Sequence, residues 1–547
     1  MPCMRCRSGG TICTYERLGS ASPSGSSNTE VGAHPSHPET GTAEPSSGGE
    51  SGRISIDFLL NFTNPLGYGP STAIAAEASA LEMLDTSADV WSPQIRLKDD
   101  HMIHNLPSYD LNDPSSVFLG FSSMMPERED WNVFPLDGDY LAPLPETTST
   151  LAIRTREMVG QLFAQQRSMM ESDSTMLANF DAALAEMVFT VANVNHFIWG
   201  FFHYFHDQFP ILHEPTFDAQ TASLPLLLAI VLVGSMSFNP SDMSIAIRQF
   251  YDAGEAYVFE LLVSKQTMHC LQEANHTVEQ VELLQAGLLL LMLQNNSENL
   301  TTRRRIRLQR TPALVAAVRC SGLFAYKRQH VVGTSDRSGW RDFILDETRV
   351  KLAAWTFMTD CILAVFFNSA PRVALSDMTG DLPCEEPLYR AKTALEFEQL
   401  LCMRHPRPSV STLSQLLSLV YSAPVSGTSI RVKEHVTASN MLVLICALLS
   451  VIMTLRMNFV ASATVEPIHG AIHGWKSLWD TLHQDAQDGV APLMGFERHA
   501  ADYWWLAKML LKVGQEGDQS CRYMQLVPCD SVKDLHEFIR KYRDYEG

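Results

Sequence analysis

The sequence lacks an excess of positive charge over its length. Its 547 residues include 61 Asp and Glu but 41 Lys and Arg, which gives a formal net charge of −20 at pH 7. A chain this acidic does not bind nucleic acid through its whole surface, because the phosphate backbone repels it. Any contact with DNA must therefore come from a small local module.

The sequence also lacks a signal peptide and a long uninterrupted apolar run. No apolar segment follows a charged start near the N-terminus. The two most apolar stretches, 224–233 and 441–455, are each shorter than the roughly 18 residues that a membrane-spanning helix needs. We expect both stretches to be helices buried in a protein core.

Cysteine is scarce and scattered except at the N-terminus. Eight of the eleven cysteines stand singly between positions 270 and 529, which predicts reduced, buried thiols inside a cell. The other three, Cys3, Cys6 and Cys13, have the spacing C-x2-C-x6-C. Thiolates two residues apart can reach one zinc ion, and the glycines at 9 and 10 let the chain turn back toward it. The spacing alone leaves open both a zinc site and an incidental cluster.

The segments that follow the cysteines have the composition of a linker. Residues 18–52 are rich in Ser, Pro, Gly and Thr, so they cannot bury enough apolar surface to fold, and we predict disorder there. They contain no apolar heptad repeat that would predict a dimerising coiled coil. Residues 53–150 alternate acids with single large apolar residues, which is typical of a transcriptional activation segment or of a solvated linker. We assign 18–148 as one disordered and acidic region.

From residue 149 to 547 the sequence shows helical periodicity and almost no strand alternation. We therefore predict an all-α body of many helices. The helix that starts after Thr277 has a cap backed by Gln280, three residues further on. The predicted helices cover 150–170, 177–194, 224–238, 242–264, 277–294, 312–318, 411–421, 435–459, 471–482 and 498–513.

The most distinctive stretch is 196–218, where an aromatic helix meets two prolines. Phe197, Phe201 and Phe205 recur at helical spacing, and Pro210 and Pro215 then turn the chain twice. The residues before the two prolines, at 209 and 214, are expected to be extended. We interpret 209–217 as a rigid elbow, and this name is kept below.

The elbow reads Phe-Pro-Ile-Leu-His-Glu-Pro-Thr-Phe and resembles the signature of the fungal-specific transcription factor domain. The segments 319–324 and 349–383 resemble two further landmarks of that family, so the resemblance covers about 195–460. It implies an all-α regulatory domain in a nuclear regulator of RNA polymerase II transcription. The implied partners are DNA, the transcription machinery or coregulators, and a small-molecule effector.

The N-terminal cysteines, preceded by Pro2 and followed by Tyr15, resemble the second half of the binuclear zinc cluster of these regulators. The cofactor implied is zinc. The resemblance implies Cys3, Cys6 and Cys13 as its ligands, and Arg5, Arg7 and Arg17 as DNA phosphate contacts.

Three thiolates do not close a tetrahedral zinc site. In the family, three more cysteines and a basic helix precede this half, and only two residues precede Cys3 here. One interpretation is a gene model that starts at an internal methionine, so that the intact regulator binds DNA. The alternative is a DNA-blind coregulator that acts through protein contacts alone.

Several other residues invite a functional interpretation. Asp360 lies on an apolar helix, and we expect a buried ion pair with Arg349 or Arg372 rather than a catalytic role. The histidines at 203, 206 and 213 are interpreted as polar edges of an aromatic core, with a metal site as the alternative. The basic block 303–310 is compatible with a nuclear import signal, a phosphate-binding loop or a solvated loop. With no nucleotide loop, nucleophile elbow or paired carboxylates, we predict that the chain is not an enzyme.

Overall fold

The structure is a computed structural model, and the chain divides into two units, 1–53 and 54–547. The predicted zinc cluster, linker and acidic segment, 1–148, lie outside the described residues, so they stay predictions. Within the part that is described, all regular secondary structure is helical, which confirms the predicted all-α class. The described residues are 149–172, 180–237, 242–269, 277–297, 299–329, 337–403, 411–422, 436–458, 465–484 and 495–543.

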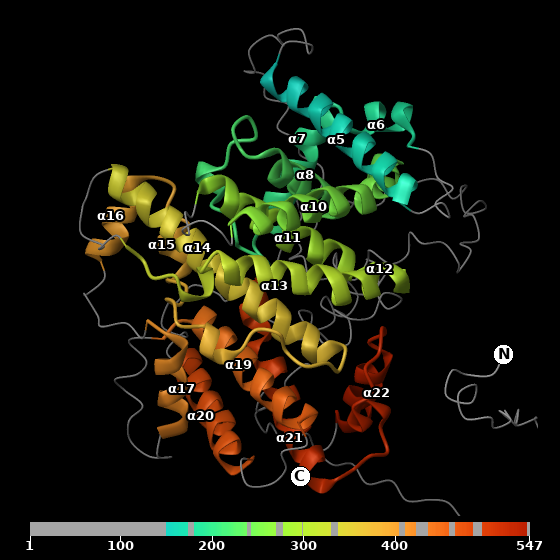
Figure 1. Ribbon diagram of the computed structural model, residues 1–547. Helices are drawn as coiled ribbons and strands as arrows, with labels where there is room; N and C mark the ends of the chain where they lie inside the picture. The colour runs from blue at the N-terminus through green and yellow to red at the C-terminus, as the bar shows by residue number, and fades with distance from the viewer. Residues whose placement is uncertain are drawn as a thin grey trace, which may run out of the picture. The chain divides into compact units, whose positions relative to one another are not determined.

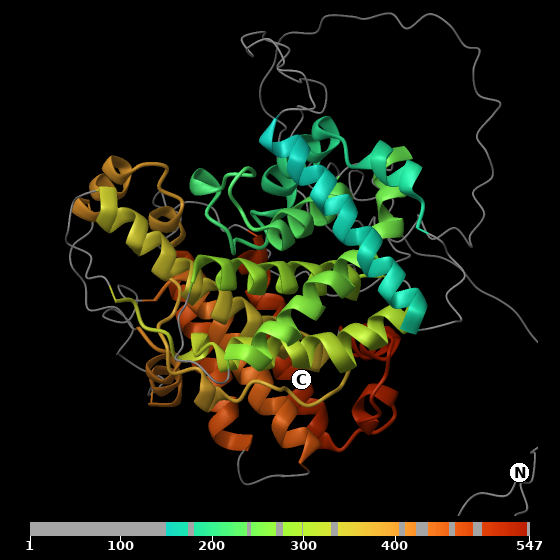
Figure 2. The ribbon, with the colours of Figure 1, turned by 45° about the horizontal axis from the view of Figure 1, so that its top comes forward.

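The first group of helices packs around two apolar helices, α8 and α11 (Figure 1). Helix α5 crosses α10 on the outside of this group, as Figure 2 shows. The group contains α5 (Thr150–Ser172), α6 (Ala182–Val188), α7 (Val191–Gly200), α8 (Leu224–Gly234), α9 (Asp242–Ala246), α10 (Tyr251–His269), α11 (Val278–Asn295), α12 (Leu300–Arg305) and α13 (Thr311–Cys320).

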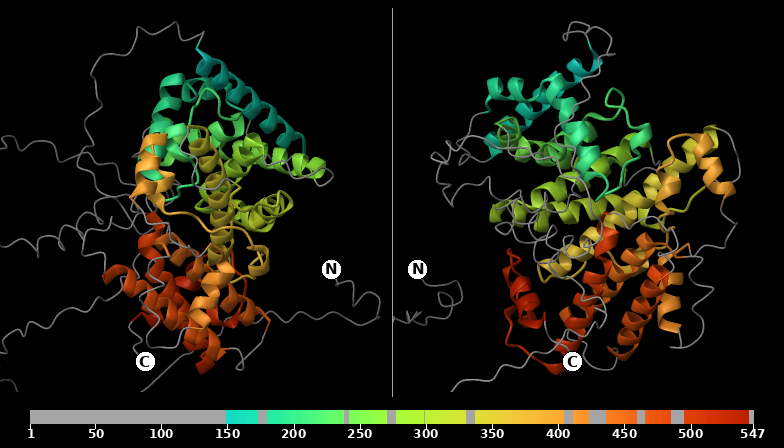
Figure 3. Two further views of the ribbon diagram at one scale, coloured as in Figure 1. Left: turned by 90° about the vertical axis from the view of Figure 1, so that its left-hand side faces the viewer. Right: turned by 180° about the vertical axis from the view of Figure 1, so that it is seen from behind.

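Helix α14 (Arg337–Phe366) joins this group to a second one, because it packs on α11 and α13 and also on α19. The second group is built around α19, which contacts α17, α20 and α21 (Figure 3). The remaining helices are α15 (Glu386–Tyr389), α16 (Ala394–Cys402), α17 (Leu413–Ser422), α19 (Ala438–Met457), α20 (Val465–Gln484), α21 (Ala500–Glu516) and α22 (Lys533–Tyr542).

One hydrophobic core runs through both groups and contains the elbow. Helices α8 and α19 are buried along most of their length, as the sequence predicted for the two most apolar stretches. By length and composition α19 could cross a membrane, but 72% of its apolar window is buried inside the protein. A small separate cluster joins the start of α14 to α15 and α16.

Local signals fix several of the helix ends that the sequence predicted. Thr277 accepts a hydrogen bond from the backbone N–H of Gln280, and the Gln280 side chain accepts one from the N–H of Thr277, so the capping box is confirmed. Gly322 ends the α13 segment with φ of +72°, a conformation that glycine adopts without strain.

Two predicted helices are interrupted in the structure, and a third, predicted over 471–482, starts earlier, at Val465. The predicted helix 177–194 is two helices, because Thr190 starts α7 as a new cap whose side chain accepts from the N–H of Asn193. The predicted helix 242–264 instead consists of α9, a 3-10 turn (Ile247–Phe250) and α10. The capping threonine explains the first difference.

The basic block 303–310 is not a solvated loop, so that expectation was wrong. It forms α12 and a π-helical turn (Ile306–Arg310). Arg305 and Arg310 both bind the fully buried Glu255, with N···O distances of 2.6 and 2.7 Å. Arg303 and Arg307 are buried. Four of the five arginines are therefore committed to the fold, which removes the accessible basic run that an import signal or phosphate loop needs.

Candidate functional site

The predicted zinc ligands Cys3, Cys6 and Cys13, and the predicted phosphate contacts at 5, 7 and 17, lie outside the described residues. Within the described part of the chain, no group of three or more metal-ligating side chains comes together. The cysteines there are free thiols. Cys361, Cys446 and Cys521 are buried as predicted, whereas Cys320 and Cys402 are exposed, which corrects the general expectation of burial.

The first half of the elbow is held in the core by α14 and α11. Its first residue, Phe209, is buried against Trp355 of α14, with 4.4 Å between the ring centroids. Gln285 of α11 donates a hydrogen bond of 2.6 Å to the carbonyl oxygen of Ile211. A π-helical turn (Phe201–Phe205) precedes the elbow, and a 3-10 turn (Glu214–Thr216) forms its second half. Residue 214 was predicted to be extended, but it is the first residue of this turn, so that prediction was wrong.

Two buried histidines, one before the elbow and one within it, form hydrogen bonds with backbone carbonyl groups. The Nε2 atom of His206 lies 2.7 Å from the carbonyl oxygen of Leu212, and Nε2 of His213 lies 3.2 Å from that of Ala391. Burial lowers the pKa of each histidine to about 4, so both rings are neutral at pH 7. His203 is exposed and stacks on Trp199. The interpretation as polar edges of an aromatic core therefore describes these rings.

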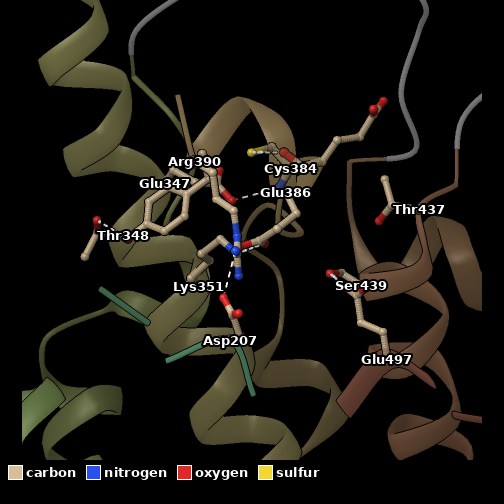
Figure 4. Close-up of polar contacts among 12 residues, drawn as sticks. Asp207, Glu347, Thr348, Lys351, Cys384, Glu386, Arg390, Thr437, Ser439 and Glu497 are labelled. Carbon is tan, nitrogen blue, oxygen red and sulfur yellow. Dashed lines mark hydrogen bonds and ion pairs between the residues drawn. The ribbon is translucent and has the colours of Figure 1, made fainter. Parts of the chain in front are cut away.

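Beside the elbow lies a group of charged and polar side chains from five separate segments, and we call this group the polar centre (Figure 4). Its members come from the residues just before the elbow, from α14, from α15 and the residue after it, from the start of α19, and from the 3-10 turn Gly495–His499. It consists of Asp207, Lys351, Glu386, Arg390, Ser439 and Glu497.

Ion pairs connect the members of the polar centre. Lys351 Nζ lies 2.5 Å from Glu386, and Arg390 lies 3.0 Å from Glu386 and 2.8 Å from Asp207. Burial alone would favour a neutral Glu386, but the charges of Lys351 and Arg390 outweigh it and lower the pKa of that carboxyl group. The charge of Glu386 likewise outweighs burial and raises the pKa of Lys351. Both groups are therefore ionised at pH 7.

The opposite side of the polar centre is a hydrogen bond between Ser439 and Glu497. Burial raises the pKa of Glu497, and its hydrogen bond to Ser439 only partly offsets this effect. Gly495 has φ of +55°, and a Cβ atom there would lie 2.4 Å from the carbonyl oxygen of Asp207. Only glycine thus lets this turn approach the elbow segment so closely.

Other buried acids of the body also have specific partners. Glu347 binds Arg328 and accepts a hydrogen bond of 2.8 Å from the backbone N–H of Cys384. Asp360 pairs with Arg372, which confirms one of the two expected partners. The other, Arg349, binds Asp346 on its own helix instead. These acids are occupied by structural partners.

Sequence reasoning missed the polar centre. Its residues come from five segments spread between positions 207 and 497, so no single local pattern brings them together. One signal was available, because Lys351 is a single cation inside the apolar run of α14 and must find a buried counter-ion. The sequence cannot show that Glu386 provides it.

The profile of the family described as Fungal specific transcription factor domain matches residues 200–477. Transcription factor verF of Penicillium polonicum is 22% identical over 482 residues, which is 84% of this chain and 64% of that protein. Zinc finger protein C11D3.17 of Schizosaccharomyces pombe is 22% identical over 42% of this chain and 36% of its own length. Zinc finger protein zas1 of the same yeast is 24% identical over 53% of this chain and 31% of its own length.

This chain thus spans less than two thirds of the length of these relatives. No solved structure matches it. The family match covers the elbow and every member of the polar centre except Glu497.

Proposed function

The chain belongs to the fungal specific transcription factor domain family, and from this premise we propose that it regulates transcription by RNA polymerase II in the nucleus. The observation that carries the proposal is the match over 200–477, in which the elbow is buried in the core. The family is a class of regulators rather than of enzymes, in agreement with the sequence prediction. In this proposal the all-α body is the regulatory module.

The proposed DNA reader is a binuclear zinc cluster that includes residues 1–17. Cys3, Cys6 and Cys13 would bind zinc, and the arginines at 5, 7 and 17 would contact phosphates. Two relatives named zinc finger proteins support a zinc module of some kind. Three thiolates leave a tetrahedral zinc ion one ligand short, so the cluster needs further ligands from outside this segment.

A tethering experiment tests the proposed regulation independently of the DNA reader. The full chain is fused to a heterologous DNA-binding domain, and transcription is measured from a reporter that carries the matching site. We expect a change in reporter transcript relative to the DNA-binding domain alone. An unchanged transcript level with a nuclear, folded fusion would contradict the proposal.

The zinc content of the purified protein separates the DNA-binding regulator from its alternative. The acidic net charge of −20 is the observation on which the alternative rests, a coregulator that acts only through protein contacts. About two zinc ions per chain would support the binuclear cluster. A content near zero would support the DNA-blind coregulator. Reading the genomic sequence upstream of codon 1 for a Cys-x-x-Cys segment in frame provides a second test.

A further inference from the structure

One face of the helix that begins at Leu300 is both apolar and cationic. Leu300 and Leu308 are 55% and 54% exposed, and Arg304 between them is exposed as well. Residues four apart lie on the same face of a helix, so α12 and the π-helical turn after it present these three side chains together. We call them the Leu-Arg-Leu face. Figure 1 shows α12 at the edge of the first group of helices.

Arg304 differs from the other arginines of the basic block 303–310. Each of the other four donates to a carboxylate or a carbonyl group of the fold. Within the described residues, Arg304 has no such partner. An exposed cation between two half-exposed leucines fits a partner that supplies a carboxylate flanked by apolar side chains.

The charge of Arg304 disfavours two other occupants of the face. In a symmetric dimer the same face of two copies meets, so the two Arg304 side chains would lie close together and repel each other. Nucleic acid would be repelled by a chain of net charge −20, and its phosphates would leave the two leucines in contact with water. An acidic and apolar peptide avoids both costs.

The chain itself contains a segment of this chemistry. Residues 129–137, Glu-Asp-Trp-Asn-Val-Phe-Pro-Leu-Asp, carry three carboxylates and no cation, together with Trp131, Phe134 and Leu136. They lie outside the described residues. Their sequence complements the face in both respects, because it offers acids to Arg304 and large apolar side chains to the two leucines.

The segment is tethered close enough to reach this face. Twelve residues, 138–149, separate it from the start of α5, and when extended they span up to about 40 Å. Helix α5 packs on α10, where Leu162 lies beside Gly254. The next residue of α10, Glu255, binds Arg305 of the basic block. The start of α5 is thus about two helix-packing distances of 8–10 Å and about 18 Å of helix axis from Arg305, which the tether covers.

We propose that residues 129–137 bind the Leu-Arg-Leu face of the same chain. A carboxylate of 129–130 accepts hydrogen bonds from Arg304, and Trp131 and Phe134 pack on the two leucines. A short tether gives an effective concentration on the order of 1 mM, so a contact with a Kd of about 0.1 mM is mostly formed within the chain. The contact goes beyond the proposed function and does not depend on it.

Photo-crosslinking in the full chain tests the contact. A benzophenone side chain is placed at Asn132, which leaves the acids and aromatic residues of the segment in place. After irradiation, the joined peptides are identified by mass spectrometry. We expect the cross-link to reach residues 300–310, in a product that migrates as a monomer.

Matched variants test the role of charge. Arg304→Glu should lower the yield of this cross-link at least about fivefold, because an attraction becomes a repulsion. The control is Arg341→Glu, at an exposed position of α14, which should keep the wild-type yield. Adding Glu129→Arg and Asp130→Arg to Arg304→Glu should restore the yield, because the charges are then exchanged.

The proposal is overturned if no cross-link reaches residues 300–310, or if Arg304→Glu leaves the yield unchanged. Cross-linked dimers as the only product would show that a second copy supplies the segment, which also overturns the contact within one chain. The failure of the proposed function is distinguishable from these results. A chain that forms the cross-link but leaves the tethered reporter unchanged keeps the contact and loses only the proposed function.

Discussion

At the scale of single residues, buried charges in this protein are held by specific partners. Glu255 is fully buried and receives hydrogen bonds from two arginines, and Lys351 is matched by Glu386. Asp360 is 1% exposed and accepts from the backbone N–H groups of Arg372 and Val373, at 2.6 and 2.8 Å. Removing one partner of such a group leaves the other charge buried and uncompensated.

We expect Asp360→Asn to lower the free energy of unfolding by about 2–4 kcal/mol, because a neutral amide accepts these hydrogen bonds less well and leaves Arg372 without its counter-ion. Urea denaturation measures the change. The control is Glu171→Gln, which breaks an exposed i, i+4 pair with Arg167 and should change stability by less than about 0.5 kcal/mol. Equal effects of the two substitutions would show that burial of Asp360 does not matter.

The buried histidines predict how stability depends on pH. The pKa of His206 is about 4 in the folded protein and about 6.5 in a model compound, so the unfolded chain takes up a proton that the folded chain refuses. Stability should therefore fall as the pH is lowered from 6.5 to 4, by up to about 1.4 kcal/mol per pH unit for this residue. His213 and His536, each with a pKa lowered to about 4, act in the same direction.

The variant His206→Gln removes one of these groups. Between pH 6.5 and 4 its stability should fall less steeply than that of the wild type, by up to about 1.4 kcal/mol per pH unit. Urea denaturation at several pH values gives the slope. His203→Gln, at an exposed position of the same segment, is the control for the effect of the substitution itself on stability. An unchanged slope in the His206→Gln protein would refute the claim that burial lowers the pKa of His206 in the folded state.

The sequence predicted the partner of a buried charge only where both residues lie in one local segment. The pairing of Asp360 with Arg372 was predictable, because the two are twelve positions apart in one recognisable segment. The pairing of Arg305 with Glu255 was not, because fifty positions separate them and a run of arginines indicates a solvated loop. The polar centre has the same long-range character.

At the scale of helices, the contact between α7 and α8 depends on one glycine. A Cβ atom at Gly234 would lie 1.9 Å from the carbonyl oxygen of Phe197, which is backbone and cannot move aside. We expect Gly234→Ala to push α7 and α8 apart and to lower the free energy of unfolding by about 1–3 kcal/mol.

The matched control is Gly160→Ala in α5, where an added Cβ meets nothing within 4 Å. This substitution should be neutral or stabilise the protein by up to about 1 kcal/mol, because alanine favours helix more than glycine does. Thermal denaturation of both variants measures the difference. Equal stability of the Gly234→Ala and Gly160→Ala variants would contradict the claim that α7 and α8 are in close contact at Gly234.

Helix positions were predictable where apolar periodicity and caps coincide. The capping box at Thr277 and the burial of α8 and α19 followed from the sequence. The break between α6 and α7 was missed, although Thr190 is a residue type that favours helix starts. The π-helical turn after α12 was missed because no local sequence rule distinguishes it from an α-helix or a loop.

At the scale of the described body, α14 connects the first group of helices to the second, and the polar centre lies where the elbow meets α14, α15 and the start of α19. The position of the polar centre depends on how the helices are connected and packed. The sequence correctly predicted the all-α class, but the class alone does not show this position.

The central claim is that this chain regulates transcription. Acute depletion of the protein in its own cells, followed by sequencing of nascent RNA, tests the claim most directly. The account predicts that a defined set of RNA polymerase II transcripts changes before protein turnover can alter the cell indirectly, and that re-expressed full-length chain restores them. A nascent RNA profile that is the same with and without the protein would contradict the claim.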